Sequence, residues 1–145
     1  MCSSDLLANK VGDFDLVVVR ENTEGFYADR NIASGGSEML ITPDVVVSLR
    51  RITRECCERI ARSAFELAMT RKRHVSIVHK ANVLRLGDGM FMDMCQAVAR
   101  EYPKVQVDEF IVDAMMAHVV RAPARFDVIV TTNMFGDILS DLTAE

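Results

Sequence analysis

Residues 126–141 read FDVIVTTNMFGDILSD. The run Asp127–Thr131 is rich in β-branched residues, which predicts a short strand buried on both faces. Polar residues and a glycine follow, and the apolar spacing of Gly136–Ala144 predicts a helix. A buried strand that passes directly into a helix indicates an α/β fold with at least partly parallel strands.

The same unit recurs toward the N-terminus. Asp15–Val19 (DLVVV), Val75–His79 and, more weakly, Val105–Phe110 have strand patterns, whereas residues 87–100 and 113–120 have helical ones. Between Glu21 and Met39 the pattern becomes polar and glycine-rich, which predicts a loop or an exposed arm.

A long helix is expected to begin at Thr42-Pro43-Asp44, because a hydroxyl, a proline and an acid suit the first positions of a helix. An apolar stripe with spacings of three and four follows, formed by Val45, Leu49, Ile52, Cys56, Ile60, Ala64 and Ala68. The opposite, polar face is expected to carry Arg50, Arg51, Arg54, Glu58, Arg59 and Arg62.

Composition narrows the class of protein. Half of the 145 residues are hydrophobic and 26% are charged, as in a folded globular domain. The net charge of -4 argues against binding to a nucleic acid backbone, and no apolar run approaches the roughly 20 residues that span a membrane. The four cysteines lack metal-ligand spacing, so we expect buried thiols and a cytoplasmic location.

Two basic residues follow predicted strands, at the edge of an α/β sheet where ligands bind. Arg20 directly follows DLVVV and suits a carboxylate or phosphate, but a surface ion pair with Glu21 or Glu24 is equally consistent with its position. Lys80 follows Val75–His79. A partly desolvated lysine can act as an acid or a base, whereas a solvated one merely ends the strand.

Acidic residues form a third group. Asp137 and Asp141 are four residues apart, so a helix places both on one face. Asp113 lies among apolar neighbours, where an unpaired charge would be unfavourable. Carboxylates are typical ligands of Mg²⁺ or Mn²⁺, but acids near a helix N-terminus also stabilise the helix without any metal.

Four stretches stand out when taken together: DLVVVRENTEGFY (15–27), IVHKANVLRLGDGMF (77–91), VDEFIVDAMM (107–116) and FDVIVTTNMFGDILSD (126–141). In this order they resemble the β-decarboxylating dehydrogenases, the isocitrate/isopropylmalate dehydrogenase family that also contains homoisocitrate and tartrate dehydrogenases. The resemblance extends from about Asp13 to the C-terminus. It implies the α/β fold of this family, with the chain containing the small dimerisation domain and part of the large domain.

The resemblance implies metal-dependent oxidation of a 2-hydroxy acid by NAD, or possibly NADP, followed by loss of the β-carboxylate. The matching positions imply that Arg20 binds a substrate carboxylate and that Asn82 lies near the substrate. Lys80 would take part in removing the hydroxyl proton, and Tyr27 would protonate the enol after CO₂ leaves. The Mg²⁺ or Mn²⁺ ligands implied by the resemblance are Asp113, Asp137 and Asp141.

The resemblance further implies a homodimer with shared active sites. Lys80 and Asp113 would reach into the partner's site, which contains Arg20, Tyr27, Asp137 and Asp141 of that partner. Residues 28–40 would belong to an arm that clasps the partner. We expect residues 13–145 to be the central part of a longer protein and residues 1–12 to be a non-native or disordered leader. The cofactor-binding residues would lie mostly outside this chain, which alone would be inactive.

Substrate and role stay open between several alternatives. RENTEG (20–25) and VHKAN (78–82) are closest to the isocitrate and homoisocitrate branches, while isopropylmalate and tartrate remain alternatives. A second hypothesis is a non-catalytic regulatory subunit of an oligomeric NAD-isocitrate dehydrogenase, which would be expected to lack some ligand positions. A third is an unrelated flavodoxin-like binding module, which the alternation of strands and helices alone would support.

Overall fold

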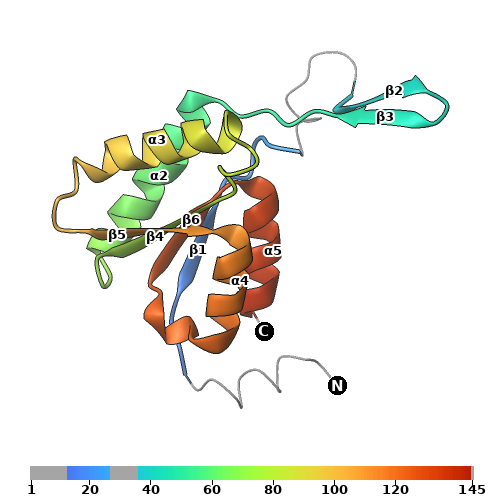
Figure 1. Ribbon diagram of the computed structural model, residues 1–145. Coiled ribbons are helices and arrows are strands. Elements are labelled where there is room, and N and C mark those ends of the chain that lie inside the picture. The colour runs from blue at the N-terminus through green and yellow to red at the C-terminus, as the bar shows by residue number, and fades with distance from the viewer. Residues whose placement is uncertain (1–12, 27–35, 145) are drawn as a thin grey trace.

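The computed structural model describes residues 13–26 and 36–144 of the chain. The predicted leader, residues 1–12, and Tyr27 lie outside the described residues. A four-stranded parallel sheet with the order β1-β6-β4-β5 forms the body of the molecule (Figure 1). Its strands are β1 (Val17–Arg20), β4 (His74–His79), β5 (Gln106–Ile111) and β6 (Val128–Thr131).

Helices cover both faces of this sheet, as expected for parallel strands joined by crossovers. On one face lie α2 (Arg54–Met69) and α3 (Gly87–Ala99). The other face carries α4 (Val112–Arg121), the short 3₁₀ turn η2 (Pro123–Arg125) and α5 (Asn133–Ala144). None of the described helices is long and apolar enough to span a membrane.

Each face of the sheet has its own core. Val128 and Val130 of β6 pack toward α2 and α3, while Ile129 between them packs toward α4 and α5. This alternation explains the continuous apolar run, because a strand covered on both faces buries every side chain. The α/β class and the four strands are thus confirmed, with strand ends within two residues of the prediction.

The long helix predicted from Thr42 is wrong over nearly its first half, because the helix begins only at Arg54. Residues 38–48 form an antiparallel hairpin instead, with β2 (Glu38–Thr42) paired to β3 (Val45–Ser48) and a turn at Pro43-Asp44. In that turn the Thr42 hydroxyl accepts a hydrogen bond from the Asp44 amide. Proline and aspartate favour turns as well as helix starts, and the three consecutive valines favour a strand.

The helix actually begins at Arg54, with Thr53 as its N-cap. The Thr53 hydroxyl accepts a hydrogen bond from the Cys56 amide, which satisfies one of the free N–H groups at the helix start. From Ile60 onward the predicted stripe is correct, since Ala64 and Ala68 are buried. Arg50, which was expected on the polar face of this helix, instead precedes it, and its side chain is nearly buried.

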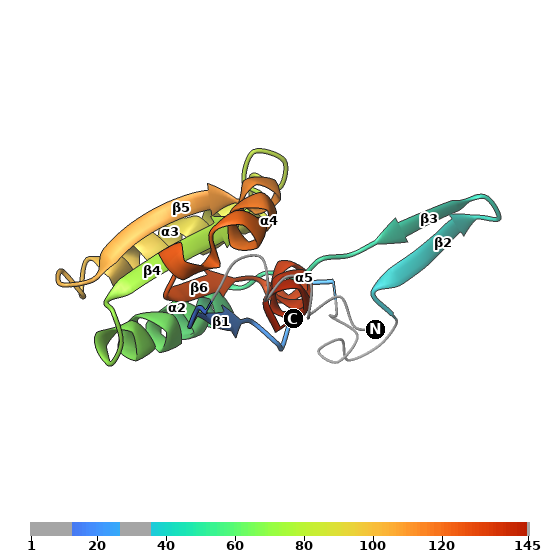
Figure 2. The same cartoon turned by 90° about the horizontal axis from the view of Figure 1, so that it is seen from below.

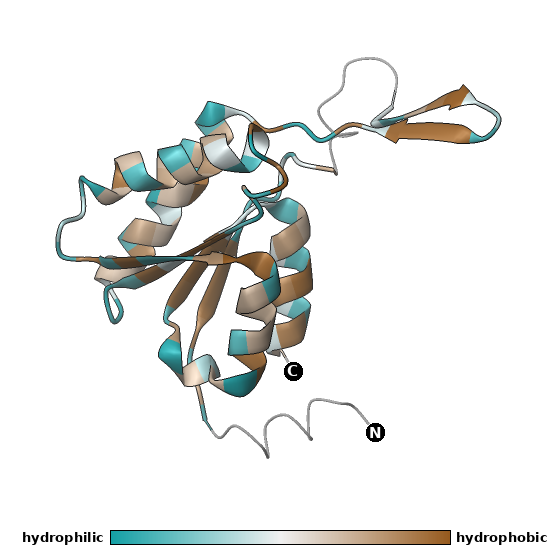
Figure 3. Cartoon of the chain, viewed as in Figure 1, coloured by the Kyte–Doolittle hydropathy of each residue, from teal (hydrophilic) through white to brown (hydrophobic). Residues whose placement is uncertain are grey.

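The β2–β3 hairpin projects away from the α/β body (Figures 1 and 2). All nine of its strand residues are exposed, and both strands are strongly hydrophobic (Figure 3). Most of the predicted arm, residues 28–40, lies outside the described residues. Its last three residues form the start of β2, so the projecting element extends further along the chain than predicted.

Two of the three described cysteines are buried, as predicted for thiols in a core, whereas Cys56 is only partly buried. Cys57 and Cys95 are buried between α2 and α3. Burial, reinforced by the nearby Glu24 carboxylate, raises the pKa of Cys57 to about 12, and burial also raises the pKa of Cys95. Because nucleophilic cysteines require the thiolate, these two are packing residues.

Candidate active site

The parallel sheet brings the predicted site residues to one edge. Arg20 ends β1, Lys80 directly follows β4, and Asp113 lies two residues after β5. Because the carboxyl ends of parallel strands share an edge, these residues lie at the same end of the molecule. They form two separate clusters there.

The first cluster joins Arg20 to the start of α5. The Arg20 guanidinium donates to Asn133 Oδ1 at 2.9 Å from Nε and to Asp137 Oδ1 at 2.7 Å from Nη1. Asn133 is buried, and its amide nitrogen donates to the Glu24 backbone carbonyl at 2.9 Å. The structure therefore records an ion pair of Arg20 with Asp137, a partner that the sequence analysis did not name.

Gly136 allows this close contact. A Cβ atom at this position would lie 2.6 Å from Arg20 Cγ and 2.8 Å from Arg20 Cβ, far inside van der Waals contact. The Arg20 side chain therefore crosses α5 where the helix has no side chain of its own. This explains a glycine inside a helix, where it normally costs about 1 kcal/mol relative to alanine.

Replacing Gly136 with alanine is expected to destabilise the protein by about 1–3 kcal/mol, since overpacking outweighs the gain in helix propensity. The matched control is Gly89→Ala in α3, where an added Cβ would meet no atom within 4 Å. That variant should be neutral or slightly more stable. Urea unfolding of both variants measures the difference, and equal stabilities would show that Arg20 can move aside without cost.

The two glutamates after Arg20 have structural roles. Glu24 is buried and accepts hydrogen bonds from the amide and hydroxyl of Thr53, the N-cap of α2. Glu21 is also buried, and its Oε1 accepts from the amide and hydroxyl of Thr23. Gly25 has a φ of +94°, a conformation that favours glycine, and its amide and carbonyl pair with those of Arg51.

The second cluster is centred on Lys80. Its amine lies 2.5 Å from Asp113 Oδ2, and the two side chains are 22% and 67% exposed. The expected partner for the charge of Asp113 is thus present, although this carboxylate is exposed rather than buried. His79 has a structural role, because its Nδ1 accepts a hydrogen bond from the Ala81 amide. Asn82 is exposed in the following turn.

Asp137 and Asp141 have the donor chemistry of a divalent-cation site. Both lie on α5 with helical spacing of four, Asp141 is exposed, and the Asp137 side chain is 43% exposed. These oxygens fit the preference of Mg²⁺ or Mn²⁺ for carboxylates plus water and substrate oxygens. Within residues 13–26 and 36–144, however, no three acidic, histidine or cysteine side chains gather closely enough to hold one ion.

The two clusters lie toward opposite sides of the sheet edge. Arg20 ends β1 and Asp113 follows β5, which are three strand spacings apart, about 14 Å, whereas α5 with its two aspartates follows β6, which is two spacings from β5, about 10 Å. One chain therefore separates Asp113 from the pair on α5. This is the arrangement expected if Asp113 and Lys80 serve a different site from Arg20, Asp137 and Asp141.

Sequence reasoning missed two residues beside the second cluster. Asp88 is fully buried and Arg50 nearly so, and the two form an ion pair of 2.6 Å. The available signal was an aspartate between two glycines, Gly87 and Gly89, directly before an apolar helix. Arg50 carried no such signal, because its position next to Arg51 resembles a solvated charge.

Comparison with known proteins identifies the class. The isocitrate/isopropylmalate dehydrogenase family matches residues 1–145, and this chain belongs to that family. A crystal structure of isocitrate dehydrogenase from Methylococcus capsulatus superimposes with a TM-score of 0.82 at 46% identity, covering 91% of this chain and 38% of that one. The hypothesis of an unrelated flavodoxin-like module is therefore wrong.

Particular relatives fall into two groups. A 3-isopropylmalate dehydrogenase of Archaeoglobus fulgidus is 50% identical over 131 residues, which cover 90% of this chain and 38% of that protein. The mitochondrial isocitrate dehydrogenase (NAD) regulatory subunit 2 of Arabidopsis thaliana is 44% identical over 139 residues, covering 95% of this chain and 36% of that protein. The chain thus spans somewhat more than a third of the length of these relatives.

Proposed function

We propose that the complete protein oxidises a 2-hydroxy acid with NAD or NADP and then releases the β-carboxylate as CO₂. The observation that carries this proposal is the placement of Lys80 with Asp113, and of Arg20 with Asp137, at the carboxyl edge of a sheet that belongs to this family. Membership of this fold class favours a dehydrogenase reaction, but the argument for the proposed chemistry depends on these residues.

Each residue has a role that its chemistry can perform. The Arg20 guanidinium binds a substrate carboxylate, for which its planar fork is suited. The Lys80 amine accepts the proton of the substrate hydroxyl during oxidation, and Tyr27 returns a proton to carbon after CO₂ has left. Asn82 contributes to binding the substrate.

The aspartates Asp137 and Asp141 of one subunit and Asp113 of the other would hold Mg²⁺ or Mn²⁺. When bound, the ion polarises the substrate oxygens and stabilises the negative charge that develops during decarboxylation. The exposed oxygens of Asp137 and Asp141 on one face of α5 support this assignment.

A homodimer would complete the site. The separation of the two clusters in one chain leaves Asp113 apart from the pair on α5. The projecting hairpin is apolar and exposed, with Leu40, Ile41 and Val46 each more than half exposed. Such a surface is normally covered, and a second hairpin related by two-fold symmetry would cover it with an identical surface.

We favour isocitrate or homoisocitrate as the substrate because of the residues RENTEG (20–25) and VHKAN (78–82). Isopropylmalate is the competing choice, because isopropylmalate dehydrogenases of several archaea and of Corynebacterium efficiens are 45–50% identical to this chain.

A non-catalytic regulatory subunit is the second candidate function. Relatives with that name in Arabidopsis thaliana and Dictyostelium discoideum are 42–44% identical to this chain. Catalysis is favoured because the chain retains the tyrosine, the lysine and all three aspartates that the reaction requires, Tyr27, Lys80, Asp113, Asp137 and Asp141.

The proposal is tested by expressing the complete gene product and measuring reduction of NAD and NADP with Mn²⁺. Isocitrate, homoisocitrate, isopropylmalate and tartrate are supplied in turn, and light scattering reports the oligomeric state. We expect metal-dependent turnover of one of these acids by a dimer. A folded dimer that turns over none of them would contradict the catalytic role and favour the regulatory subunit.

A further inference from the structure

A buried ion pair lies directly beneath the turn that carries Lys80. Asp88, at the start of α3, is fully buried, and its Oδ1 lies 2.6 Å from Arg50 Nη2. Its other oxygen, Oδ2, accepts a hydrogen bond of 2.5 Å from the backbone amide of Lys80. One carboxylate therefore holds both the arginine and the backbone of the proposed proton acceptor.

Backbone hydrogen bonds also connect the rest of this turn to Lys80 and Asp88. The Lys80 carbonyl accepts hydrogen bonds from the amides of Val83 and Leu84, at 3.0 and 2.8 Å. The amide of Asp88 in turn donates to the Leu84 carbonyl at 2.9 Å. Both backbone polar groups of Lys80 are thus engaged, and Asp88 closes the loop of contacts.

Arg50 connects this turn to the first cluster. Its Nη2 also donates to the Thr132 hydroxyl at 3.2 Å. Thr132 directly precedes Asn133, which accepts a hydrogen bond from Arg20. The guanidinium lies 5.9 Å from the ring centres of both Phe26 and Phe135. Gly87 leaves it room, since a Cβ there would come within 2.9 Å of Arg50 Nη1.

From these contacts we propose that Asp88 and Arg50 are positioning residues, which hold the backbone of Lys80 so that its amine meets the reacting hydroxyl. The inference rests on the proposed function of Lys80. Stability alone is a weak reason for such a pair, because burying two charges costs about as much as their attraction returns. Holding the backbone of a flexible lysine rigidly can assist the reaction, because proton transfer requires the amine to be placed accurately against the substrate hydroxyl.

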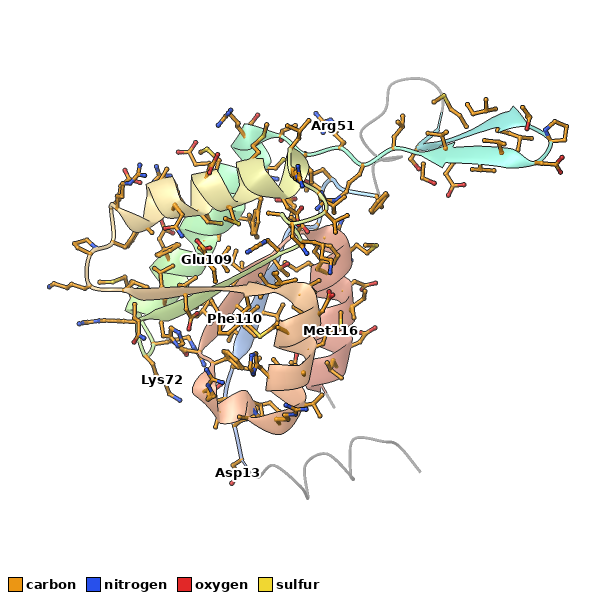
Figure 4. The ribbon with its side chains drawn as sticks, in the orientation of Figure 1. Asp13, Arg51, Lys72, Glu109, Phe110 and Met116 are labelled. Atoms are coloured by element: carbon orange, nitrogen blue, oxygen red, sulfur yellow. The ribbon has the colours of Figure 1, made fainter. Side chains whose placement is uncertain are left out.

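The chain contains a matched control at the opposite end of the sheet. Asp127 is also buried, pairs with Arg71 at 2.8 Å and accepts a hydrogen bond of 2.9 Å from the Lys72 amide. It reproduces the same three-part arrangement far from the proposed site, at the end where Lys72 and Asp13 lie, whereas Arg51 lies at the other (Figure 4). A purely structural role would make both aspartates respond alike.

The experiment compares Asp88→Asn with Asp127→Asn in the complete gene product. For Asp88→Asn we expect kcat to fall roughly 10- to 100-fold, with the KM for the hydroxy acid changed by less than about threefold. Amide hydrogen exchange in peptides covering residues 80–87 should become faster. Asp127→Asn should lower the melting temperature comparably but leave kcat and this exchange unchanged. Arg50→Lys, which keeps the charge beside Asp88, should retain most of the activity.

Hydrogen exchange separates failure of this inference from failure of the proposed function. Unchanged exchange at residues 80–87 in Asp88→Asn overturns the positioning role whatever the enzyme does. Faster exchange with full kcat shows that the turn is held but that its position does not matter, which also overturns it. If the unmodified protein is inactive on all four acids, the proposed function fails, and with it the catalytic purpose of the pair.

Discussion

Replacing Lys80 with methionine in the complete protein is expected to lower kcat by about 100- to 10,000-fold, the contribution typical of a positioned general acid or base. Methionine preserves much of the aliphatic length but cannot accept the proton. The fold should survive, because the partner carboxylate of Asp113 is 67% exposed and water can solvate it when the amine is removed.

The measurement is steady-state kinetics with saturating metal and cofactor, together with a melting curve. Lys104→Met is the control, since Lys104 is an exposed lysine in the turn before β5. It should retain full activity. Comparable turnover by the two variants would remove Lys80 from the reaction and favour the interpretation of a solvated lysine at a strand end.

Asp137→Asn is expected to weaken binding of Mn²⁺ by at least about 10- to 100-fold, a loss that even an outer partner of a metal ligand can cause. The amide has the same shape but no charge, and hard divalent cations depend on the charge of their oxygen ligands. The same change removes the 2.7 Å ion pair with Arg20, so the KM for the substrate carboxylates should rise as well.

Calorimetric titration of the dimer with Mn²⁺ in the presence of the hydroxy acid tests this without relying on turnover. The control is Asp93→Asn, which removes one negative charge from an exposed position on α3. It should bind Mn²⁺ as the unmodified protein does. Equal affinities in the two variants would contradict a metal site on α5 and leave Asp137 as the ion-pair partner of Arg20 alone.

The elements that could be predicted from sequence are those whose pattern has a single structural meaning. The run Val128-Ile129-Val130, apolar at every position, is consistent with burial on both faces, and the structure covers both. The site residues at the strand ends follow from this, because parallel strands bring Arg20, Lys80 and Asp113 to one edge whatever the details of packing.

The β2–β3 hairpin could not be separated from a helix by the same reasoning. Thr42, Pro43 and Asp44 suit the start of a helix and the turn of a hairpin alike. The three valines after them, Val45 to Val47, are all exposed and face no core in this chain. Apolar periodicity normally indicates which face of an element is buried, so it could not distinguish a helix from a strand here. Long-range contacts determine which local option is adopted.

Sequence patterns were sufficient to predict the α/β class, the four strands of the sheet and the polar residues at their ends, because each depends on short-range patterns of apolar and polar residues. The tertiary fold alone determined that Arg50, expected on a solvated helix face, is buried against Asp88, and that Gly136 makes room for Arg20. It also separated the site residues into two clusters. Such contacts join residues 38 to 117 positions apart, and no local pattern records a distance of that kind.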